Sequence, residues 1–254
     1  MQLFDLTGKV ALVTGGGRGL GRAMARGFAE AGADVFISAR TESELASAQK
    51  EIIEATGRKV IYATADMADR GAVKVLAARA MDEMGRVDVL VNNAGINRPQ
   101  PIDEIDDGDW DTQIEVNLSS VMALTRALVP QMKQRQWGRI IHISSILGVG
   151  SKEARNAYSA TKSALIGLSK ASALDLGPHG ITVNCIAPGP FLTDLPGKLL
   201  NDEQKQKFAD FTAMGRWADP KEIVGPALFL GSEASSYVTG ETLLVDGGAY
   251  ARAL

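Results

Sequence analysis

Short runs of β-branched and other apolar residues alternate along this chain with longer segments in which apolar positions recur at helical spacing. The predicted strands are Val10–Val13, Val35–Ser38, Val60–Ala63, Val87–Val91, Arg139–Ile143, Thr182–Ile186 and Thr242–Val245. The predicted helices are Gly21–Glu30, Ser43–Ala55, Ala72–Met84, Trp110–Gln134, Tyr158–Leu176 and Pro220–Leu230. Repeated alternation implies right-handed βαβ crossovers, and parallel strands are apolar throughout because both of their sides are buried. The pattern therefore predicts an α/β fold, with a doubly wound seven-stranded parallel sheet and helices on both faces.

One segment departs from the alternation, and it runs from Pro188 to about Gly215. It holds a polar, helix-like run, Asn201–Asp210, inside a long insertion between a strand and the next helix. In a compact domain such an insertion is often a lid, so we expect a substrate loop or lid at about residues 190–215. No linker, low-complexity tract or internal repeat divides the rest, so residues 1–254 are expected to form one domain.

Composition and charge limit which binding partners we expect for this protein. The 27 Lys and Arg against 30 Asp and Glu give a net charge of −3 without a long basic run, so we expect no nucleic-acid or anionic-membrane partner. No apolar stretch approaches the roughly 18 residues of a membrane span, and the first residues lack a signal-peptide pattern, which favours a cytoplasmic protein. The single cysteine, Cys185, and the two histidines, His142 and His179, show no metal-binding spacing, so no metal is expected.

A glycine-rich turn follows the first predicted strand and precedes a helix, with the sequence TGGGRGLG at residues 14–21. Glycines permit a tight turn and a close approach of pyrophosphate, and a helix N-terminus offers free N–H groups to phosphate. The spacing is G-x-x-x-G-x-G, which matches neither the strict G-x-G-x-x-G pattern nor the Walker pattern. A flexible loop without a ligand is the alternative to a nucleotide site. The candidate nucleotide contacts are Gly15, Gly17, Arg18, Gly19, Leu20 and Gly21.

The end of the second predicted strand bears on the choice of nucleotide. NAD-binding proteins of this layout place an acidic residue there, about 20 residues past the glycines, to hold the ribose 2′-hydroxyl. Here Arg40 occupies that place, and no carboxylate occurs before Glu42. Arg18 and Arg40 are suited to a 2′-phosphate, unless both are solvated surface side chains. We therefore expect NADP(H) to be preferred over NAD(H).

Tyr158 and Lys162 begin a predicted helix and share one of its faces, since they are four residues apart. An ammonium beside a phenol favours the phenolate, so Lys162 is expected to lower the tyrosine pKa from about 10 and make it a general acid/base. Alone, such a pair is more often a surface contact. Ser144 and Ser145, however, end the preceding strand, at the carboxyl edge where α/β sheets bind ligands.

Five separated motifs occur in order: Thr14-Gly15-x-x-x-Gly19-x-Gly21, Asn92-Asn93-Ala94-Gly95, Ser145, Tyr158-x-x-x-Lys162 and Pro188-Gly189. Together they resemble the classical short-chain dehydrogenase/reductase family over essentially the whole chain. The resemblance implies a single Rossmann domain, and hydride transfer between a nicotinamide cofactor and a secondary alcohol or ketone. Non-catalytic nucleotide-binding regulators, and single-nucleotide or flavin-binding proteins, are the alternatives from other classes.

The resemblance also implies roles for single residues. Tyr158 would exchange a proton with the substrate oxygen, and Lys162 would lower the tyrosine pKa and bind the nicotinamide ribose. Ser145, rather than Ser144, would hydrogen-bond the substrate carbonyl, and Asn117 would hold a proton-relay water. Asp66 and Met67 would lie near the adenine, and Thr193 near the nicotinamide carboxamide. Further cofactor contacts are implied for Asn93, Ala94, Gly95, Pro188, Gly189 and Phe191.

The resemblance also bears on the substrate. The implied substrate contacts are Arg98, Ser145, Leu147, Arg155 and Tyr158. Either arginine suits a substrate carboxylate, unless it faces solvent. The surroundings of residues 95–98, 187–194 and 215–220 most resemble gluconate 5-dehydrogenase-like members, which act on sugar acids, and 3-oxoacyl-(acyl-carrier-protein) reductases are the close alternative. The resemblance further implies a homotetramer that pairs the helices at 110–134 and 158–176 and the segment Val245–Tyr250.

Overall fold

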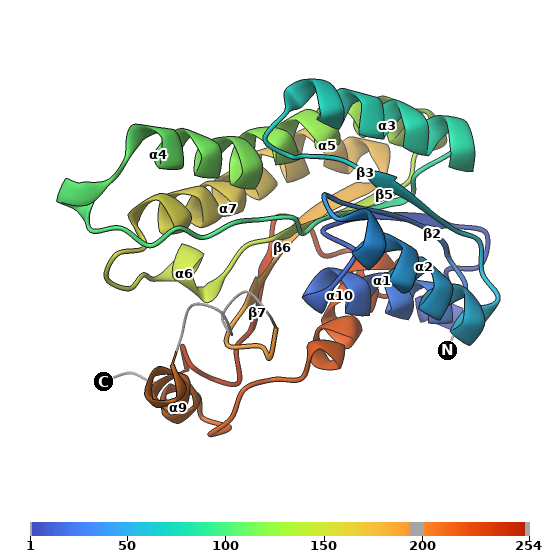
Figure 1. The fold of residues 1–254 in the computed structure, drawn as a ribbon. Coiled ribbons are helices and arrows are strands. Elements are labelled where there is room, and N and C mark those ends of the chain that lie inside the picture. Colours follow the sequence, from blue (N-terminus) through green and yellow to red (C-terminus); the bar gives the residue numbers. More distant parts are fainter. Residues whose placement is uncertain (1, 194–200, 252–254) are drawn as a thin grey trace.

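A seven-stranded parallel sheet organises the chain in the computed structural model, which describes residues 2–193 and 201–251 (Figure 1). Its strand order is β3-β2-β1-β4-β5-β6-β7. The strands are β1 (Val10–Thr14), β2 (Asp34–Ala39), β3 (Val60–Thr64), β4 (Val89–Asn92), β5 (Gly138–Ile143), β6 (Ile181–Pro188) and β7 (Thr242–Val245). The strand order reverses between β1 and β4, and ligands of such sheets bind at the carboxyl edge beside that reversal. The predicted doubly wound parallel sheet is confirmed.

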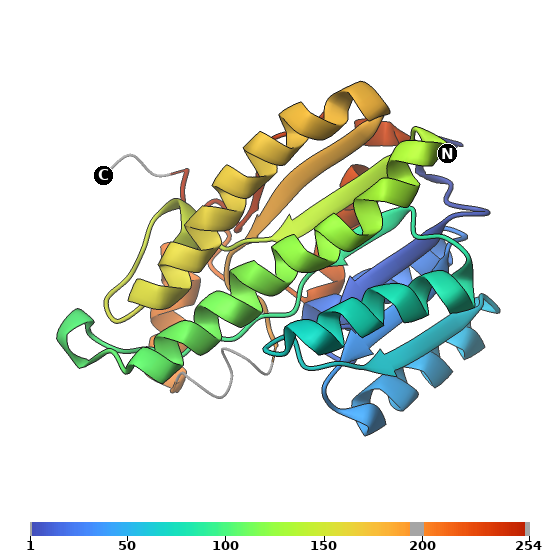
Figure 2. The same ribbon diagram turned by 90° about the horizontal axis from the view of Figure 1, so that it is seen from above.

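Helices cover both faces of the sheet (Figures 1 and 2). One layer holds α1 (Gly19–Glu30), α2 (Glu42–Thr56) and α10 (Val224–Gly231). The other holds α3 (Arg70–Met84), α4 (Asp107–Ile114), α5 (Ser120–Arg135) and α7 (Asn156–Leu176). The strands β1, β5 and β6 are buried at every position, because both of their faces pack against helices. None of the helices in the described ranges has the length and apolar content that a bilayer span requires.

Two predicted helices are less regular than their hydrophobic pattern suggests. The segment predicted as Trp110–Gln134 is α4 and α5 joined by a π-helical turn, Glu115–Ser119. A π turn accommodates one extra residue without breaking the apolar face, so the periodicity does not reveal it. The segment predicted as Pro220–Leu230 begins as a 3-10 turn, Pro220–Ile223, whose capping box is closed by Asp219 and Glu222.

The remaining elements are short and connect the layers. The helical turns are Gln2–Phe4, Ile102–Glu104, Gly177–His179 and Glu233–Ser235, and the short helices are α6 (Ile146–Val149) and α9 (Asp202–Phe211). The polar run expected within the insertion is α9, and Asn201 begins it with a capping box. Of the lid predicted at 190–215, residues 194–200 lie outside the described residues.

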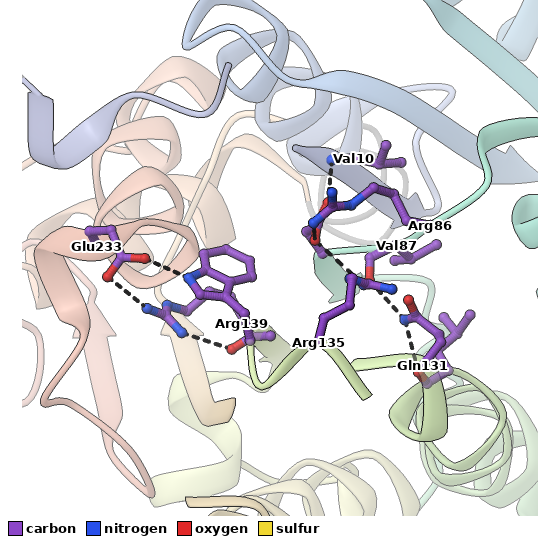
Figure 3. A network of polar contacts seen from close by, with 11 residues as sticks. Val10, Arg86, Val87, Gln131, Arg135, Arg139 and Glu233 are labelled. Atoms are coloured by element: carbon purple, nitrogen blue, oxygen red, sulfur yellow. Dashed lines mark hydrogen bonds and ion pairs between the residues drawn. The ribbon is translucent and has the colours of Figure 1, made fainter. Parts of the chain in front are cut away.

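A buried carboxylate holds the amino edge of the sheet together. Asp88 is 0% exposed, accepts the backbone N–H of Val10 at 2.9 Å, and receives Arg86 at 2.6 Å and Arg135 at 3.4 Å. Figure 3 shows both arginines converging beside Val10, and Arg135 also donates to the Val87 carbonyl at 3.0 Å. A buried carboxylate requires such partners, so this edge is occupied by structural contacts. The opposite, carboxyl edge carries the candidate site.

Candidate active site

A cavity of about 350 Å³ opens at the carboxyl edge of the sheet. It is lined by the glycine turn after β1 and by the segments that follow β2, β3, β4, β5 and β6. The predicted site residues that line it are Gly15, Gly17, Arg18, Gly19, Leu20, Arg40, Asp66, Met67, Asn93, Ala94, Gly95, Ser145, Leu147, Arg155, Tyr158, Lys162, Pro188, Gly189, Phe191 and Thr193. Gly21, Asn117 and Arg98 are not among the residues that line it.

Tyr158 and Lys162 lie in the first turns of α7 and face this cavity together. The Lys162 ammonium nitrogen lies 5.6 Å from the centre of the tyrosine ring and donates to the carbonyl oxygen of Ile143 at 2.7 Å. Because Lys162 is buried, its pKa is lowered to about 8, with the Cys185 thiol acting in the opposite direction. Lys162 is thus held against the end of β5.

The expected lowering of the Tyr158 pKa by Lys162 is wrong for this structure. Burial is the largest influence and raises the tyrosine pKa, while a hydrogen bond with Ser145 and the charge of Arg155 lower it. The Lys162 nitrogen lies over the ring face, and burial lowers the pKa of Lys162 itself. The cation that favours the phenolate is therefore Arg155, one helical turn before Tyr158.

The two serines at the end of β5 have separate partners. Ser145 caps α6, and its hydroxyl oxygen accepts the backbone N–H of Leu147 at 3.1 Å, while Ser145 also bonds with Tyr158. The Ser144 hydroxyl instead donates to the carbonyl oxygen of Lys162 at 2.8 Å. Ser144 therefore fastens α7 to β5, and Ser145 is the serine that contacts Tyr158.

Asn117 lies in the π turn, fully buried and outside the cavity lining. Its amide donates to the carbonyl of Ile96 at 2.9 Å and to the hydroxyl of Thr161 at 3.2 Å, and its oxygen accepts the Ile96 N–H at 2.9 Å. The residue therefore connects the loop after β4 to α7 just beneath the cavity.

The glycine turn forms a close-fitting cradle at the start of α1. A Cβ atom on Gly21 would lie 2.1 Å from the carbonyl oxygen of Gly15, and Gly15 itself has φ +66°. Arg18, the N-cap of α1, makes no side-chain capping hydrogen bond, so the first N–H groups of the helix are not capped by it. Small residues and uncapped N–H groups at a helix N-terminus fit the pyrophosphate of a dinucleotide.

The loop after β4 is attached directly to this cradle. The Asn93 amide donates to the carbonyl oxygen of Thr14 at 2.9 Å, and the Thr14 hydroxyl accepts the N–H groups of Asn93 and Ala94, each at 3.0 Å. These bonds hold the Asn93-Ala94-Gly95 motif beside the glycine turn. Two motifs distant in sequence therefore form one side of the cavity.

The arrangement of these motifs along the chain matches a known family. The sequence model described as short chain dehydrogenase matches residues 9–204. The chain belongs to the short chain dehydrogenase family. The resemblance inferred from the five motifs is thus confirmed, and the cradle is that of an NAD(P)-binding protein.

Similar proteins match nearly the whole dehydrogenase. Gluconate 5-dehydrogenase of Gluconobacter oxydans is 40% identical over 251 residues, which are 97% of this chain and 96% of that protein. A 3-oxoacyl-(acyl-carrier-protein) reductase of Chlamydia muridarum is 40% identical over 243 residues, 96% of this chain and 98% of that protein. A gluconate 5-dehydrogenase from Burkholderia cenocepacia J2315, solved with NADP and tartrate, is similar with a TM-score of 0.93 and 36% identity, and 99% of each chain is covered. The chain is therefore an oxidoreductase that acts on CH–OH groups.

Arg98 and Arg155, the two arginines expected to contact the substrate, differ in position. The Arg98 guanidinium forms an ion pair with Asp109, and Arg98 does not line the cavity. Arg155 lines the cavity, and its backbone is held in a parallel bridge with Gln100. Of the two, Arg155 is the one whose side chain can meet a substrate beside Tyr158.

Described residues that follow β6, among them Thr193 and Trp217, also line the cavity. Leu192 and Ala218 are joined by a 2.9 Å backbone hydrogen bond, which brings the neighbouring Trp217 to the rim. Thr193 reaches the glycine turn, where a Cβ atom on Gly19 would lie 3.4 Å from the threonine methyl group. Thr193, expected on the nicotinamide side, therefore lies close to the glycine turn.

Glu44, Phe208 and Trp217 are among the residues that line the cavity without a role predicted from the sequence. The rings of Phe208 and Trp217 meet edge to face, with centroids 5.9 Å apart, and the indole N–H donates to the Lys205 carbonyl at 2.8 Å. Phe208 is one of two aromatic side chains, with Phe211, on the mostly polar helix α9, and this is the sequence signal that could have found it. In the described part of the chain, no three His, Cys, Asp or Glu residues gather as a metal site.

Proposed function

We propose that this dehydrogenase uses NADP(H) to interconvert a secondary alcohol and a ketone on a sugar acid. The observation that carries the proposal is the Arg155 guanidinium, which lines the cavity close enough to Tyr158 to lower the tyrosine pKa. A cation beside the proton-transfer group suits a substrate that carries a carboxylate near the reacting carbon. Gluconate 5-dehydrogenases among the similar proteins support this substrate class.

The proposed residue roles follow from the contacts. Bound NADP(H) would supply or accept the hydride. The Tyr158 hydroxyl would give its proton to the carbonyl oxygen during reduction and accept it during oxidation. Ser145, already bonded to Tyr158, would donate to the same oxygen as negative charge develops there. Lys162 would hold the nicotinamide ribose, and Asn117 would position the loop after β4 and retain a proton-relay water.

Arg18 and Arg40 support the preference for NADP(H). Both line the cavity, and they flank the α2 N-terminus from the glycine turn and from the end of β2. Guanidinium groups bind phosphate through charge-assisted hydrogen bonds, and a neutral 2′-hydroxyl gains less from them. The 2′-phosphate is therefore the feature that these residues would select.

Aromatic side chains favour a sugar-like substrate at the other end of the cavity. Phe208 and Trp217 offer ring faces and edges, against which the C–H face of a polyol chain can pack. With Arg155 for the carboxylate, the site would then contact both the charged and the apolar surface of a sugar acid. The 3-oxoacyl-(acyl-carrier-protein) reductases at 40% identity favour a second candidate, reduction of a β-ketoacyl thioester.

A panel assay that follows nicotinamide absorbance tests the proposal. It compares NADPH with NADH on 5-ketogluconate, an uncharged ketone of similar size and acetoacetyl thioesters. We expect turnover of the keto acid with NADPH, and an Arg155→Gln variant with KM raised about 10- to 100-fold for the keto acid, because a charge-assisted bond is lost. Arg79→Gln, on α3 and paired with Glu83, is the matched control. Turnover of thioesters alone would replace the sugar-acid proposal.

The proton-transfer role has its own test. Tyr158→Phe removes the transferable proton, and we expect kcat to fall by about 10²- to 10⁴-fold while NADPH still binds. Full activity would end the assignment.

We further propose a homotetramer in which α5 and α7 pair between subunits. The exposed apolar side chains of Leu174 on α7 and of Tyr237 and Leu244 near β7 support buried contacts there. Light scattering would test it, and a strict monomer would refute it.

A further inference from the structure

An ion pair joins the glycine turn to helix α2 inside the cavity. The Arg18 guanidinium lies 3.3 Å from the Glu44 carboxylate, and both residues line the cavity. Arg18 precedes α1, and Glu44 lies in the first turn of α2. The pair is partly open to solvent, with side-chain exposures of 49% and 33%, so its partners can exchange for a ligand.

The position of Glu44 is fixed by the backbone around it. A Cβ atom on Gly17 would lie 3.1 Å from the Cβ of Glu44 and 3.4 Å from the N–H nitrogen of Leu45, so α2 packs directly against the glycine turn. Thr41, the N-cap of α2, makes no side-chain capping hydrogen bond and lines the same cavity, as does Arg40. Glu44 is therefore a carboxylate that lines the same cavity as two arginines and lies in the first turn of α2.

The charge of Glu44 has opposite consequences for the two nicotinamide nucleotides. A 2′-phosphate placed between Arg18 and Arg40 would be repelled by the carboxylate and would compete with it for Arg18. A 2′-hydroxyl would instead find an acceptor in the same carboxylate. We propose that Glu44 is a specificity-determining residue that competes with the 2′-phosphate for Arg18 and so holds NADP(H) and NAD(H) affinities closer together. This inference rests on the proposed 2′-phosphate site.

The inference predicts which substitution changes the balance. Glu44→Gln removes the negative charge but keeps an acceptor oxygen of the same reach, so NADPH should bind more tightly while NADH changes little. An exposed ion pair of this kind corresponds to a gain of about 1.5- to 5-fold in the ratio of NADPH to NADH affinity. The gain should shrink as salt is raised, because exposed charges are screened.

Equilibrium fluorescence titration of the full chain with NADPH and with NADH, without substrate, measures that ratio. The matched control is Glu42→Gln, which removes the same charge two residues away, outside the cavity lining, where Glu42 accepts the Tyr62 hydroxyl at 3.4 Å. Thermal unfolding of each variant without nucleotide checks that it is folded. Support requires a raised ratio in Glu44→Gln and an unchanged one in Glu42→Gln.

Three results would overturn the inference, and they separate it from the proposed function. An unchanged ratio in Glu44→Gln refutes the role of Glu44, and an equal rise in Glu42→Gln assigns the effect to net charge. A wild-type protein that binds NADH more tightly than NADPH ends the proposed NADP(H) preference, but the change caused by Glu44→Gln still decides the role of Glu44. Binding of neither nucleotide would overturn both.

Discussion

The side-chain amide of Asn117 forms a reciprocal pair of hydrogen bonds with the backbone of Ile96. It donates to the Ile96 carbonyl and accepts the Ile96 N–H, each at 2.9 Å. Asn117 sits in the π turn between α4 and α5, and Ile96 follows the Asn93-Ala94-Gly95 motif. The π turn thus serves to aim one amide at the loop that lines the cofactor side of the cavity.

Removal of that amide should loosen the loop. In Asn117→Ala the Ile96 N–H and carbonyl lose their partners, so we expect the free energy of unfolding to fall by about 2 kcal/mol and activity to fall with it. Urea denaturation measures the first effect and the panel assay the second. Asn156→Ala, which deletes one 3.1 Å bond to the Gln100 carbonyl, should cost less. Equal losses in the two variants would contradict a special role for the Asn117–Ile96 pair.

The Arg155 charge should be visible in the pH profile of alcohol oxidation. Arg155 lowers the pKa of Tyr158, which burial raises, so Arg155→Met should raise that pKa further. Alcohol oxidation requires the Tyr158 phenolate as base. In Arg155→Met the increase of kcat/KM with pH should therefore occur at higher pH than in the wild-type protein. An uncharged secondary alcohol is used as substrate, so that carboxylate binding does not contribute. Arg155→Lys keeps a positive charge and should keep the profile closer to wild type; an unmoved profile in Arg155→Met would rule out the coupling.

Much of this fold could be predicted from the sequence, because its strands are short apolar runs and its site motifs are local. The strands β1, β5 and β6 are buried at every position because helices cover both of their faces, and their short β-branched runs are visible without coordinates. The glycine turn and the Tyr158-x-x-x-Lys162 pair are local in sequence, so their spacing alone indicated a site.

Features that depend on tertiary contacts could not be predicted from the sequence. The Tyr158 pKa is set by burial, which spacing does not give, and the expected effect of Lys162 was therefore misjudged. Asp109, eleven residues beyond Arg98 in sequence, pairs with it only after α4 folds beside the loop. Glu44 and Trp217 reach the cavity through the packing of α2 and through the Leu192–Ala218 hydrogen bond.

Stability at acidic pH should depend on His142. This side chain is 0% exposed, bonds with the Asn92 amide at 3.1 Å, and has a pKa lowered from 6.5 to about 3 by burial and by the Lys162 charge. Between those values the unfolded chain binds a proton that the folded chain does not, so stability falls as pH decreases from 6.5 toward 3. The slope from this one residue approaches about 1.4 kcal/mol per pH unit.

Denaturation series at several pH values test that linkage. In His142→Gln the titrating group is gone, so the stability difference from the wild-type protein should shrink as pH falls below 6.5. His179→Gln removes the other histidine of the chain and should leave the wild-type slope in place. Parallel slopes for the wild-type protein and His142→Gln would show that His142 does not contribute.

NADPH binding by the glycine turn should depend on the absence of a Cβ atom at Gly21. A Cβ atom there would lie 2.1 Å from the Gly15 carbonyl oxygen and 2.6 Å from the Asn93 amide nitrogen, so Gly21→Ala must displace backbone in the glycine turn. Overpacking of this kind costs about 1–3 kcal/mol. Because the displaced glycine turn would no longer fit the pyrophosphate, NADPH affinity should drop by about 10- to 100-fold. Titration with NADPH and thermal unfolding measure the two effects. Gly225→Ala is the control, because Gly225 lies in α10 with nothing within 4 Å of the added atom, and alanine should be neutral or slightly stabilising in a helix. If Gly21→Ala bound NADPH like Gly225→Ala, the turn would have to be more adaptable than its contacts indicate.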